Sequence, residues 1–251
     1  MKSNPFSTKF LVPLSTAEGV SQYLEKAIVF GDLKHGTRLI ERDLAETLGV
    51  SRIPIREAFR ILEIGGLVKI IPRKGAQVTA ISPKEIEDIY TLRAHLVSLA
   101  AKLAAANAQE SDLQAMTQIS KRMEEKMKKN DFRSFFELNV QFHHLLAKAS
   151  GNQKLKQILE NLGKQTFRFR YISLGLPGRL KLTLGKHNQL IAAIKARNGK
   201  LSEKIAQRNI EGAKVALLKY MVDHPEHFDS LGGYSVSKIP VIKNYGSLWT
   251  V

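Results

Sequence analysis

SRIPIREAFRILEIGGLVKIIPRKG, residues 51–75, decides the fold of the first part of the chain. Ser51 is a residue type that often caps a helix N-terminus, and Pro54 falls in the first turn, where its missing N–H does no harm. Four apolar residues recur at helical spacing and form an inner face: Ile55, Ala58, Phe59 and Leu62. Gly65-Gly66 ends this helix, and the strands LVKII and AQVTAI are predicted on either side of a basic PRKG turn.

Two further short helices are expected before this segment. TAEGVSQYLEKAIVFGDL, residues 16–33, and LIERDLAETLGV, residues 39–50, both carry apolar residues at helical spacing, and Gly49 is a natural stop for the second. The second and third helices are joined through LGVS. Three short helices followed by a hairpin are typical of a winged helix–turn–helix, whose third helix enters the DNA major groove.

The arginines of this segment are placed for contact with DNA. Arg52 and Arg56 lie one turn apart at the entering end of the third helix, where both can reach base edges. Arg42, on the preceding helix, is placed for a phosphate or base contact. The residues of the basic turn would form a wing against the sugar–phosphate backbone: Arg73, Lys74 and Gly75. The alternative is a solvated three-helix domain with incidental arginines.

The charge balance suggests a polyanionic partner without locating it. The 251 residues carry 39 Lys and Arg against 23 Asp and Glu, a formal net charge of +16. Residues 1–80 hold 12 basic and 8 acidic residues, a net of +4, and residues 81–251 hold 27 and 15, a net of +12. Because the excess is not concentrated around the opening stretch, charge alone places no nucleic-acid site.

Some classes of protein are disfavoured. The chain has no cysteine, so disulfides and thiolate metal sites are excluded. The N-terminus lacks the continuous apolar run of a signal peptide. The most apolar helix-like stretch, LRAHLVSLAAKLAAANA, is interrupted by Arg93, His95 and Lys102, so no membrane span is expected. We expect a cytoplasmic protein.

A domain boundary is expected at SPKE, residues 82–85, which has the residue order of a helix start. Beyond it only helical periodicity is present to about residue 228, in six segments: 83–106, 111–128, 131–149, 152–173, 178–197 and 199–223. The prediction is a mainly α protein in three parts: a winged helix–turn–helix domain over 1–81, an all-α effector-sensing and dimerisation bundle of six to seven helices over 82–228, and an unassigned tail over 229–251.

Polar side chains fall on the apolar faces of four of these helices. Arg93 interrupts the inner stripe of the first, and Asn139 and His143 share the inner stripe of the third. His187 and Asn209 lie in register with apolar residues of the last two helices. An unpaired guanidinium inside a bundle is costly, so five convergent polar positions favour a ligand pocket. The alternative is that each is a satisfied core residue.

GTRLIERDLAETLGVSRIPIREAFRILEIGGLVKIIPRKGAQV, residues 36–78, resembles the winged helix–turn–helix of GntR-type bacterial transcriptional regulators. The matching signature is G-x-x-L-x-E-x-x-L-A-x-x-L-G-V-S-R-x-P-[IV]-R-E-A-[LF]-x-x-L-x-x-x-G-L-V, followed by P-x-[KR]-G-x-x-V. The resemblance covers roughly residues 17–80 and implies a homodimer on a short palindromic operator. It implies DNA contacts at these positions: Arg42, Ser51, Arg52, Pro54, Arg56, Lys74 and Gly75.

Residues 84–225 resemble the FCD ligand-sensing domain that often accompanies such a head. The resemblance rests on IYTLRAHLVSLAAKLAA, FFELNVQFHHLLAKASGNQKL and KHNQLIAAIKARN. Metal-binding members place an Asp and three His around a zinc-like ion. Asn139 stands here at the Asp position and Asn209 at the last His position, and amide oxygens are weak zinc ligands. We therefore expect no tightly held metal; a weakly bound Zn or Ni ion at His143 and His187 is the alternative.

Without a metal, the five polar residues of the bundle are expected to bind an effector directly. They are Arg93, Asn139, His143, His187 and Asn209. A guanidinium among them favours a small organic acid as the effector.

These features predict a DNA-binding transcriptional regulator, a repressor rather than an enzyme, associated with the bacterial nucleoid when it occupies its operator. Effector binding would change the spacing of the two recognition helices in the dimer and weaken binding to half-sites of fixed spacing. Two alternatives stay open. One is a metal-dependent hydrolase built on His143, His144 and His187, which lacks a carboxylate base beside them. The other is an architectural DNA-binding protein without a ligand.

Overall fold

The computed structural model describes residues 16–29, 32–33, 36–79 and 83–224. The chain divides into two compact units, with the boundary between Ile81 and Ser82. The predicted tail, 229–251, and the predicted helix cap Ser82 lie outside the described residues. No helix in the described ranges has the length and apolar character needed to cross a membrane.

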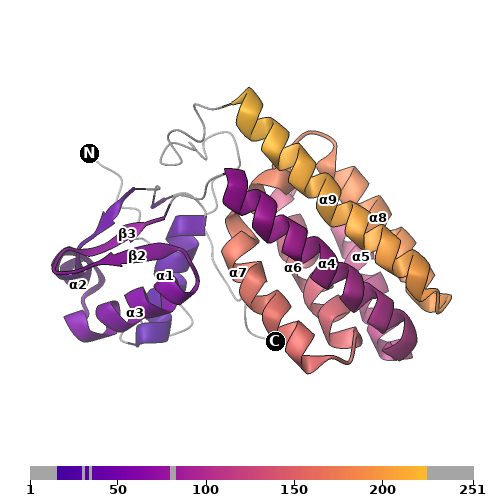
Figure 1. Cartoon of the computed structure of the whole chain (residues 1–251), viewed down its shortest axis with the longest axis horizontal. Coiled ribbons are helices and arrows are strands. Elements are labelled where there is room, and N and C mark those ends of the chain that lie inside the picture. The colour runs from indigo at the N-terminus through magenta and orange to yellow at the C-terminus, as the bar shows by residue number, and fades with distance from the viewer. Residues whose placement is uncertain (1–15, 30–31, 34–35, 80–82, 225–251) are drawn as a thin grey trace. The chain divides into compact units, whose positions relative to one another are not determined.

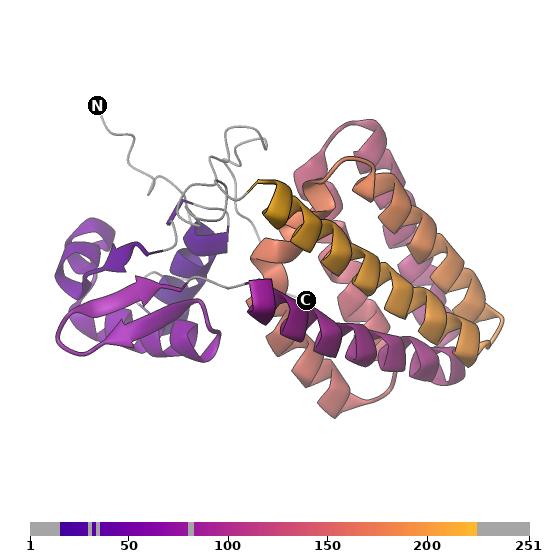
Figure 2. The ribbon, with the colours of Figure 1, turned by 45° about the horizontal axis from the view of Figure 1, so that its top comes forward.

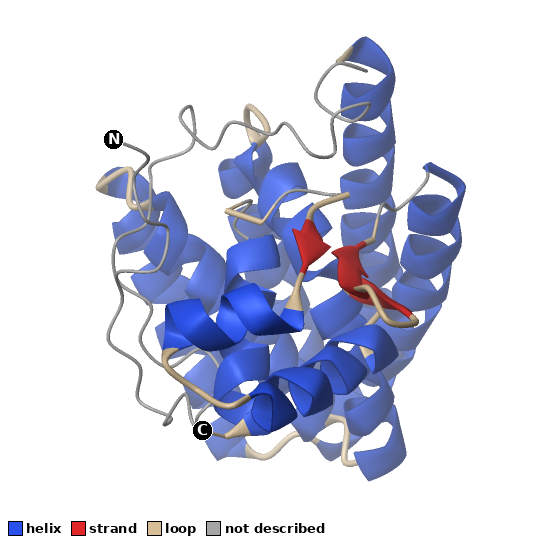
Figure 3. Ribbon diagram, turned by 90° about the vertical axis from the view of Figure 1, so that its left-hand side faces the viewer, coloured by secondary structure: helices blue, strands red, loops and turns tan. Residues whose placement is uncertain are grey.

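The first unit is a three-helix domain with a small sheet (Figures 1 and 3). Its helices are α1 (Ala17–Val29), α2 (Glu41–Leu48) and α3 (Arg52–Ile64), and its strands are β1 (Arg38–Leu39), β2 (Val68–Ile71) and β3 (Gly75–Val78). The strands are antiparallel in the order β1-β3-β2. The hairpin of β2 and β3 was predicted, whereas β1 was not, because two residues are too few to show an alternating pattern.

Local signals explain where α2 and α3 meet. Gly49 ends α2 in the left-handed region, at φ 67°, and its N–H bonds to the carbonyl of Ala45. Ser51 stands before α3 with an extended backbone, as predicted, but its hydroxyl does not accept the capping hydrogen bond expected from the sequence. The predicted inner face of α3 is buried along its whole length.

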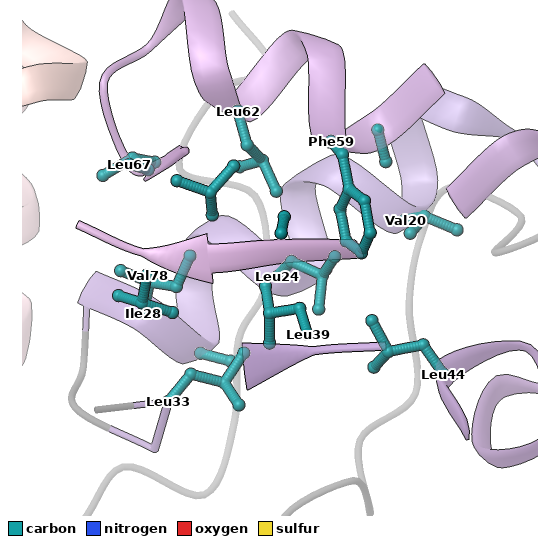
Figure 4. Packing of buried hydrophobic residues seen from close by; sticks show 14 of the residues in the cluster. Val20, Leu24, Ile28, Leu33, Leu39, Leu44, Phe59, Leu62, Leu67 and Val78 are labelled. Atoms are coloured by element: carbon teal, nitrogen blue, oxygen red, sulfur yellow. The ribbon is translucent and has the colours of Figure 1, made fainter. Parts of the chain in front are cut away.

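The core of the first unit forms where α1 and α3 pack on the sheet (Figure 4). Leu24 and Phe59 face each other from the two helices, and Leu39 and Val78 close the core from the strands. Phe59 is 1% exposed. This small core fixes the third helix against the hairpin, so the outer face of α3 and the β2–β3 turn are presented together.

The second unit is an all-α bundle, as predicted (Figures 1 and 2). The described residues form six helices in it: α4 (Pro83–Asn107), α5 (Glu110–Lys128), α6 (Phe132–Ala149), α7 (Gln153–Gly175), α8 (Arg179–Lys195) and α9 (Gly199–Asp223). Each observed boundary falls within two residues of the predicted one. Side-chain caps start α6, α7 and α9, since Asp131 accepts a hydrogen bond from the N–H of Ser134, Asn152 from that of Leu155 and Asn198 from that of Leu201.

Helix α4 is the centre of this packing. It contacts α6, α7 and α8, and it lies beside α9, to which it is joined by a hydrogen bond from Lys214 Nζ to Thr91 Oγ1 and by an ion pair of Lys102 with Glu203. The polar residues on the inner faces of these helices are therefore brought to one region of the bundle.

Candidate functional site

A basic groove lies between α3 and the β2–β3 hairpin of the first unit. Its volume is about 730 Å³. Six arginines from α2, α3 and the sheet line it: Arg38, Arg42, Arg52, Arg56, Arg60 and Arg73. Lys74 and Gly75 complete the wing side. Ser51 and Pro54 are not part of the groove lining, although both lie at the start of the same helix.

Arg56 is held by a carboxylate in the absence of DNA. Its Nη2 lies 2.8 Å from Glu41 Oε2 and its Nε lies 3.1 Å from Glu41 Oε1, which makes the pair bidentate. The hydrogen bonds from Arg56 lower the pKa of Glu41, and the pair correspondingly raises the pKa of Arg56. Arg60 pairs with Glu57 and Arg42 with Asp43, whereas Arg52 forms no salt bridge among the described residues. Of the two arginines predicted to contact bases, Arg56 is therefore bound to a carboxylate of the protein and Arg52 is not.

Replacing Glu41 should release Arg56. Glu41→Gln removes the negative charge that the guanidinium fork now binds, so the fork becomes available to phosphates. We expect tighter binding to unrelated DNA, with the slope of log K against log salt steeper by about one unit. Fluorescence anisotropy on operator and scrambled duplexes over a salt series measures this. Glu57→Gln, which frees Arg60 further along α3, is the matched control; an unchanged slope for Glu41→Gln would mean that Arg56 never reaches DNA.

The wing turn depends on a glycine for reasons internal to the fold. Gly75 has φ 85°, and a Cβ added there would lie 2.1 Å from the carbonyl oxygen of Leu39. Arg73, at φ 62°, precedes it in the same tight turn. Gly75 was predicted to let the wing approach DNA closely; in the structure β1 already occupies the space that a side chain would need.

The second unit contains a small polar cavity of about 30 Å³. The predicted residues Arg93, Asn139, His143 and Asn209 all line it. The other polar lining residues come from α4, α7 and α8: Tyr90, Arg170, Ser173, Arg179 and Thr183. A volume of this size holds about two water molecules, so a metabolite can enter only if the lining side chains withdraw.

Two arginines of this cavity were missed by the sequence analysis. Arg170 is 7% exposed and Arg179 is 8% exposed, against 4% for Arg93. Arg170 lies in a stretch of α7 that is buried on nearly every side, from Thr166 to Leu174 among the residues whose side chains are described. Periodicity assigns no inner face to such a segment. Arg179 was given no role in the sequence analysis; it is the first residue of α8 and is buried.

The cavity is strongly electropositive. Its lining has no Asp or Glu among the described residues. Burial, and then the neighbouring charge of Arg93, lower the pKa of Arg170 to about 9. Burial also lowers the pKa of Arg93 and of Arg179, and raises the pKa of the Tyr90 hydroxyl. Three buried guanidiniums therefore line a cavity that has no Asp or Glu among its described lining residues.

Several polar atoms around the cavity have no hydrogen-bond partner. They are Arg170 Nη2, Arg179 Nε, Asn139 Oδ1 and His143 Nδ1. Buried polar groups in folded proteins are almost always satisfied. Donors and an acceptor left open around one cavity point to a bound polar ligand or ordered water.

His187 lies behind the cavity wall rather than on it. Its ring stacks on Phe142 at 3.8 Å and 8° and meets the His143 ring edge-on at 5.4 Å. The side chain is 1% exposed, and neither ring nitrogen has a hydrogen-bond partner. His187 is not among the cavity-lining residues, so its predicted contact with the effector stays a prediction. His144 is turned away, with Nδ1 3.1 Å from Glu160 Oε1.

The residues present do not fit a tightly held divalent metal. His143 and His187 are the only imidazoles at the site, the other donors are the amides of Asn139 and Asn209, and no group of three His, Cys, Asp or Glu suited to a metal occurs in the described part of the chain. Burial, Arg93 and Arg170 hold the pKa of His143 well below its usual range. Charges that disfavour a proton on this imidazole also disfavour a divalent cation beside it.

The buried histidine pair predicts sensitivity to acid. Burial, and then Arg170, lower the pKa of His187 to about 3, below its value of about 6.5 in the unfolded chain. The unfolded state binds a proton between these values and the folded state does not, so stability falls as pH falls through this window. For His187 the loss is about 1.4 kcal/mol per pH unit, or about 2 kcal/mol at pH 5.

His187→Leu should remove this acid response. Urea titrations at pH 7.5 and pH 5.0 are expected to show a difference about 2 kcal/mol smaller than in the unchanged protein, without a loss of stability at pH 7.5. His187→Gln also cannot titrate but keeps an unsatisfied polar group, so it should flatten the response at lower overall stability. A full acid response in both variants would show that another group titrates.

The chain was compared with known proteins. Residues 16–78 match the model for bacterial regulatory proteins of the gntR family, and residues 88–212 match the FCD domain. An uncharacterized HTH-type transcriptional regulator YdhC of Bacillus subtilis is 34% identical over 208 residues, which are 81% of this chain and 87% of YdhC. The HTH-type transcriptional repressor RspR of Escherichia coli is 28% identical over 192 residues, 76% of this chain and 84% of RspR.

Solved structures show the same fold. E. coli McbR/YncC superposes with a TM-score of 0.69 at 24% identity, covering 82% of this chain and 98% of that one. Nothing in these comparisons supports the hydrolase alternative, and Glu137, the carboxylate nearest in sequence to the histidines, is engaged by Arg133 at 2.8 Å.

Proposed function

Since this chain belongs to the GntR family of bacterial transcriptional regulators and carries an FCD domain, we propose that it is a dimeric repressor whose operator affinity is lowered by a small acid bound in the second unit. DNA binding through the helix–turn–helix and a ligand-sensing role for the helical unit come with the family. The palindromic operator, the dimer, the contact residues and the acidic effector are the proposal. The observation that carries this proposal is the electropositive cavity. Three buried guanidiniums without an acidic partner are unfavourable in a core that binds no ligand.

The basic groove supports the proposed contacts with DNA. The N-terminal turns of α3 are exposed, and Arg52 and Arg56 project there beside Arg42 of α2. A helix of this kind fits the major groove, where arginine forms paired bonds with guanine. Arg73 and Lys74 at the wing then contact phosphates or the minor groove, and Ser51 adds a phosphate contact with the hydroxyl that does not cap the helix.

Exposed apolar side chains support a dimer through the second unit. Leu92 and Leu99 of α4 are 50% and 40% exposed, and Val215 and Val222 of the adjacent α9 are 61% and 78% exposed. A separation of seven residues places both members of each pair on the same side of their helix. Contact with a second copy of the chain would cover these positions and bring two heads to the two half-sites of a palindrome.

The cavity is suited to pass a signal because its wall is built from α4, α6, α7, α8 and α9. At about 30 Å³ it cannot accept an organic acid without movement of these helices or their arginines. The effector then binds the expanded state better than the contracted one, which is the condition for a shift between them. RspR is named as a repressor, which favours release from DNA as the direction of the response.

The test is operator selection followed by titration. Selection from random duplexes is expected to enrich one palindrome, bound by two chains as measured by analytical ultracentrifugation. Small organic acids added to that complex should lower its affinity, and Arg93→Gln should abolish the response while leaving operator binding intact. Equal affinity for all duplexes would instead establish the architectural alternative, and an acid that tightens binding would establish a co-repressor.

A further inference from the structure

The effector cavity holds more positive charge than a simple carboxylate can neutralise. Arg93, Arg170 and Arg179 come from three different helices and are each less than 10% exposed. No acidic side chain lines the cavity with them in the described part of the chain. Burying a charge without a partner is unfavourable, and the charge of Arg93 acts on Arg170, so a bound anion would offset a cost that the second unit otherwise carries.

The open hydrogen-bonding positions match an oxyanion. Arg170 Nη2 and Arg179 Nε are buried donors without partners, on opposite sides of the step from α7 to α8. Guanidiniums bind carboxylate and phosphate groups through paired, charge-assisted bonds. A single carboxylate could accept from both donors through its two oxygens, but its one negative charge offsets only one of the three guanidinium charges.

The guanidiniums also supply the positive charge that a metal ion would otherwise offer to an acidic ligand. A divalent ion would add positive charge to a cavity that already has three, beside imidazoles whose protonation those charges oppose. Asn139 and Asn209 provide no negative charge to offset it. Anion binding therefore needs no metal at this site.

We propose that the cavity takes a compact anion with at least two negative charges, a small dicarboxylate or a phosphate group, held by Arg93, Arg170 and Arg179 without a metal ion. This rests on the proposed function of the second unit as effector-binding and specifies the effector's class. Neutralising the three charges stabilises the unit, so the anion acts as a structural counter-ion as well as a signal. Because the cavity of about 30 Å³ has to enlarge to admit any organic acid, the smaller members of the class are favoured.

Removal of one guanidinium should have opposite effects on binding and on stability. Arg170→Gln and Arg179→Gln each remove charge-assisted bonds to the anion, for an expected loss of about tenfold to hundredfold in affinity. The same changes relieve repulsion in the empty cavity, so the anion-free variants are expected to melt at a higher temperature than the anion-free unchanged chain. A guanidinium with only a structural role would give lower melting temperatures.

Malonate, inorganic phosphate and acetate serve as probes on the full chain. The protein is treated with EDTA, dialysed into chloride and titrated at constant ionic strength, because screening otherwise changes with each salt. Calorimetry and melting curves are expected to show binding of malonate or phosphate at least tenfold tighter than acetate, unchanged by EDTA. Comparing the affinities for malonate and for phosphate then shows whether the site prefers a dicarboxylate or a phosphate group.

Arg197→Gln is the matched control variant. Arg197 Nη1 donates to the carbonyls of Ala105 and Ala106 at 3.3 and 3.2 Å and does not line the cavity. Its replacement should lower the melting temperature and leave anion affinity unchanged. Identical affinities for acetate and malonate, unchanged affinities in Arg170→Gln and Arg179→Gln, or binding that requires added Zn²⁺ and disappears with EDTA would each overturn the proposal.

Measurements of operator affinity distinguish a failure of the metal-free dianion site from a failure of the proposed regulatory function. If acetate with Zn²⁺ releases the operator and malonate does not, the regulator is acid-controlled and the metal-free dianion site is wrong. If malonate or phosphate binds as expected but leaves operator affinity unchanged, the anion site stands and its role as the effector site fails.

Discussion

Gly75→Ala is expected to destabilise the first unit by about 3 kcal/mol, within the range for substitutions that strain a special backbone position. A left-handed backbone costs a non-glycine residue about 1–2 kcal/mol. At Gly75 the added Cβ would also meet the carbonyl oxygen of Leu39 at 2.1 Å. Since that oxygen belongs to the backbone of β1, no side chain can move to relieve the contact, and β1 must separate from β3.

Urea denaturation followed by operator binding measures the effect. The midpoint for unfolding of the first unit should move to lower urea, and operator affinity should fall because the wing turn loses its support. Gly49→Ala is the control, since Gly49 also has a positive φ, at 67°, but an added Cβ would meet nothing within 4 Å. It should cost only the backbone strain, about 1–2 kcal/mol. Equal costs at both positions would show that the clash with β1 is relieved.

Arg52→Ala is expected to remove about 1–3 kcal/mol of discrimination at one base position of the operator, equivalent to roughly fivefold to 150-fold. Arg52 opens α3 and has no salt bridge among the described residues, so its guanidinium is free to bond paired acceptors on a guanine. Binding to duplexes altered one position at a time locates the loss.

Arg60→Ala is the control for Arg52→Ala. Arg60 lies two turns further along α3, already pairs with Glu57, and should affect all duplexes alike or not at all. A uniform loss for Arg52→Ala would reassign that residue to a phosphate. The same experiment on Arg56→Ala decides whether the pair with Glu41 opens on DNA.

Much of the fold could be predicted from the sequence because its signals are local. Gly49 and Gly66 end helices at positive φ, and Asp131 and Asn152 start them, so boundaries followed from single residues. Strand β1 could not be predicted, since its two residues form a strand only by pairing with Gln77 and Ala76, which are far away in sequence. The predicted capping hydrogen bond of Ser51 is absent, because a serine before a helix can form that bond but does not have to.

The cavity could be predicted only in part. Helical periodicity correctly predicted that four residues face inward: Arg93, Asn139, His143 and Asn209. It shows which face of a helix a residue lies on but not whether the residue reaches the cavity, and His187 is not among the lining residues. The inward position of Arg170 could not be predicted from periodicity. The helix around it is buried on nearly all sides, so no apolar face stands out on which a charged residue would be noticed. A count of charges in segments that are otherwise apolar would have found it.

Helix α4 couples the two halves of the chain by covalent continuity. It begins at Pro83, two residues after the boundary between the units, and reaches the cavity at Tyr90 and Arg93. At 1.5 Å per residue, the effector site lies about 15 Å along this axis from its start. A helix is stiff over that length, so a displacement of Arg93 moves the first turns of α4 with it. The residues from Pro83 to Arg93 therefore fix both the distance and the rotational angle between the effector site and the start of α4.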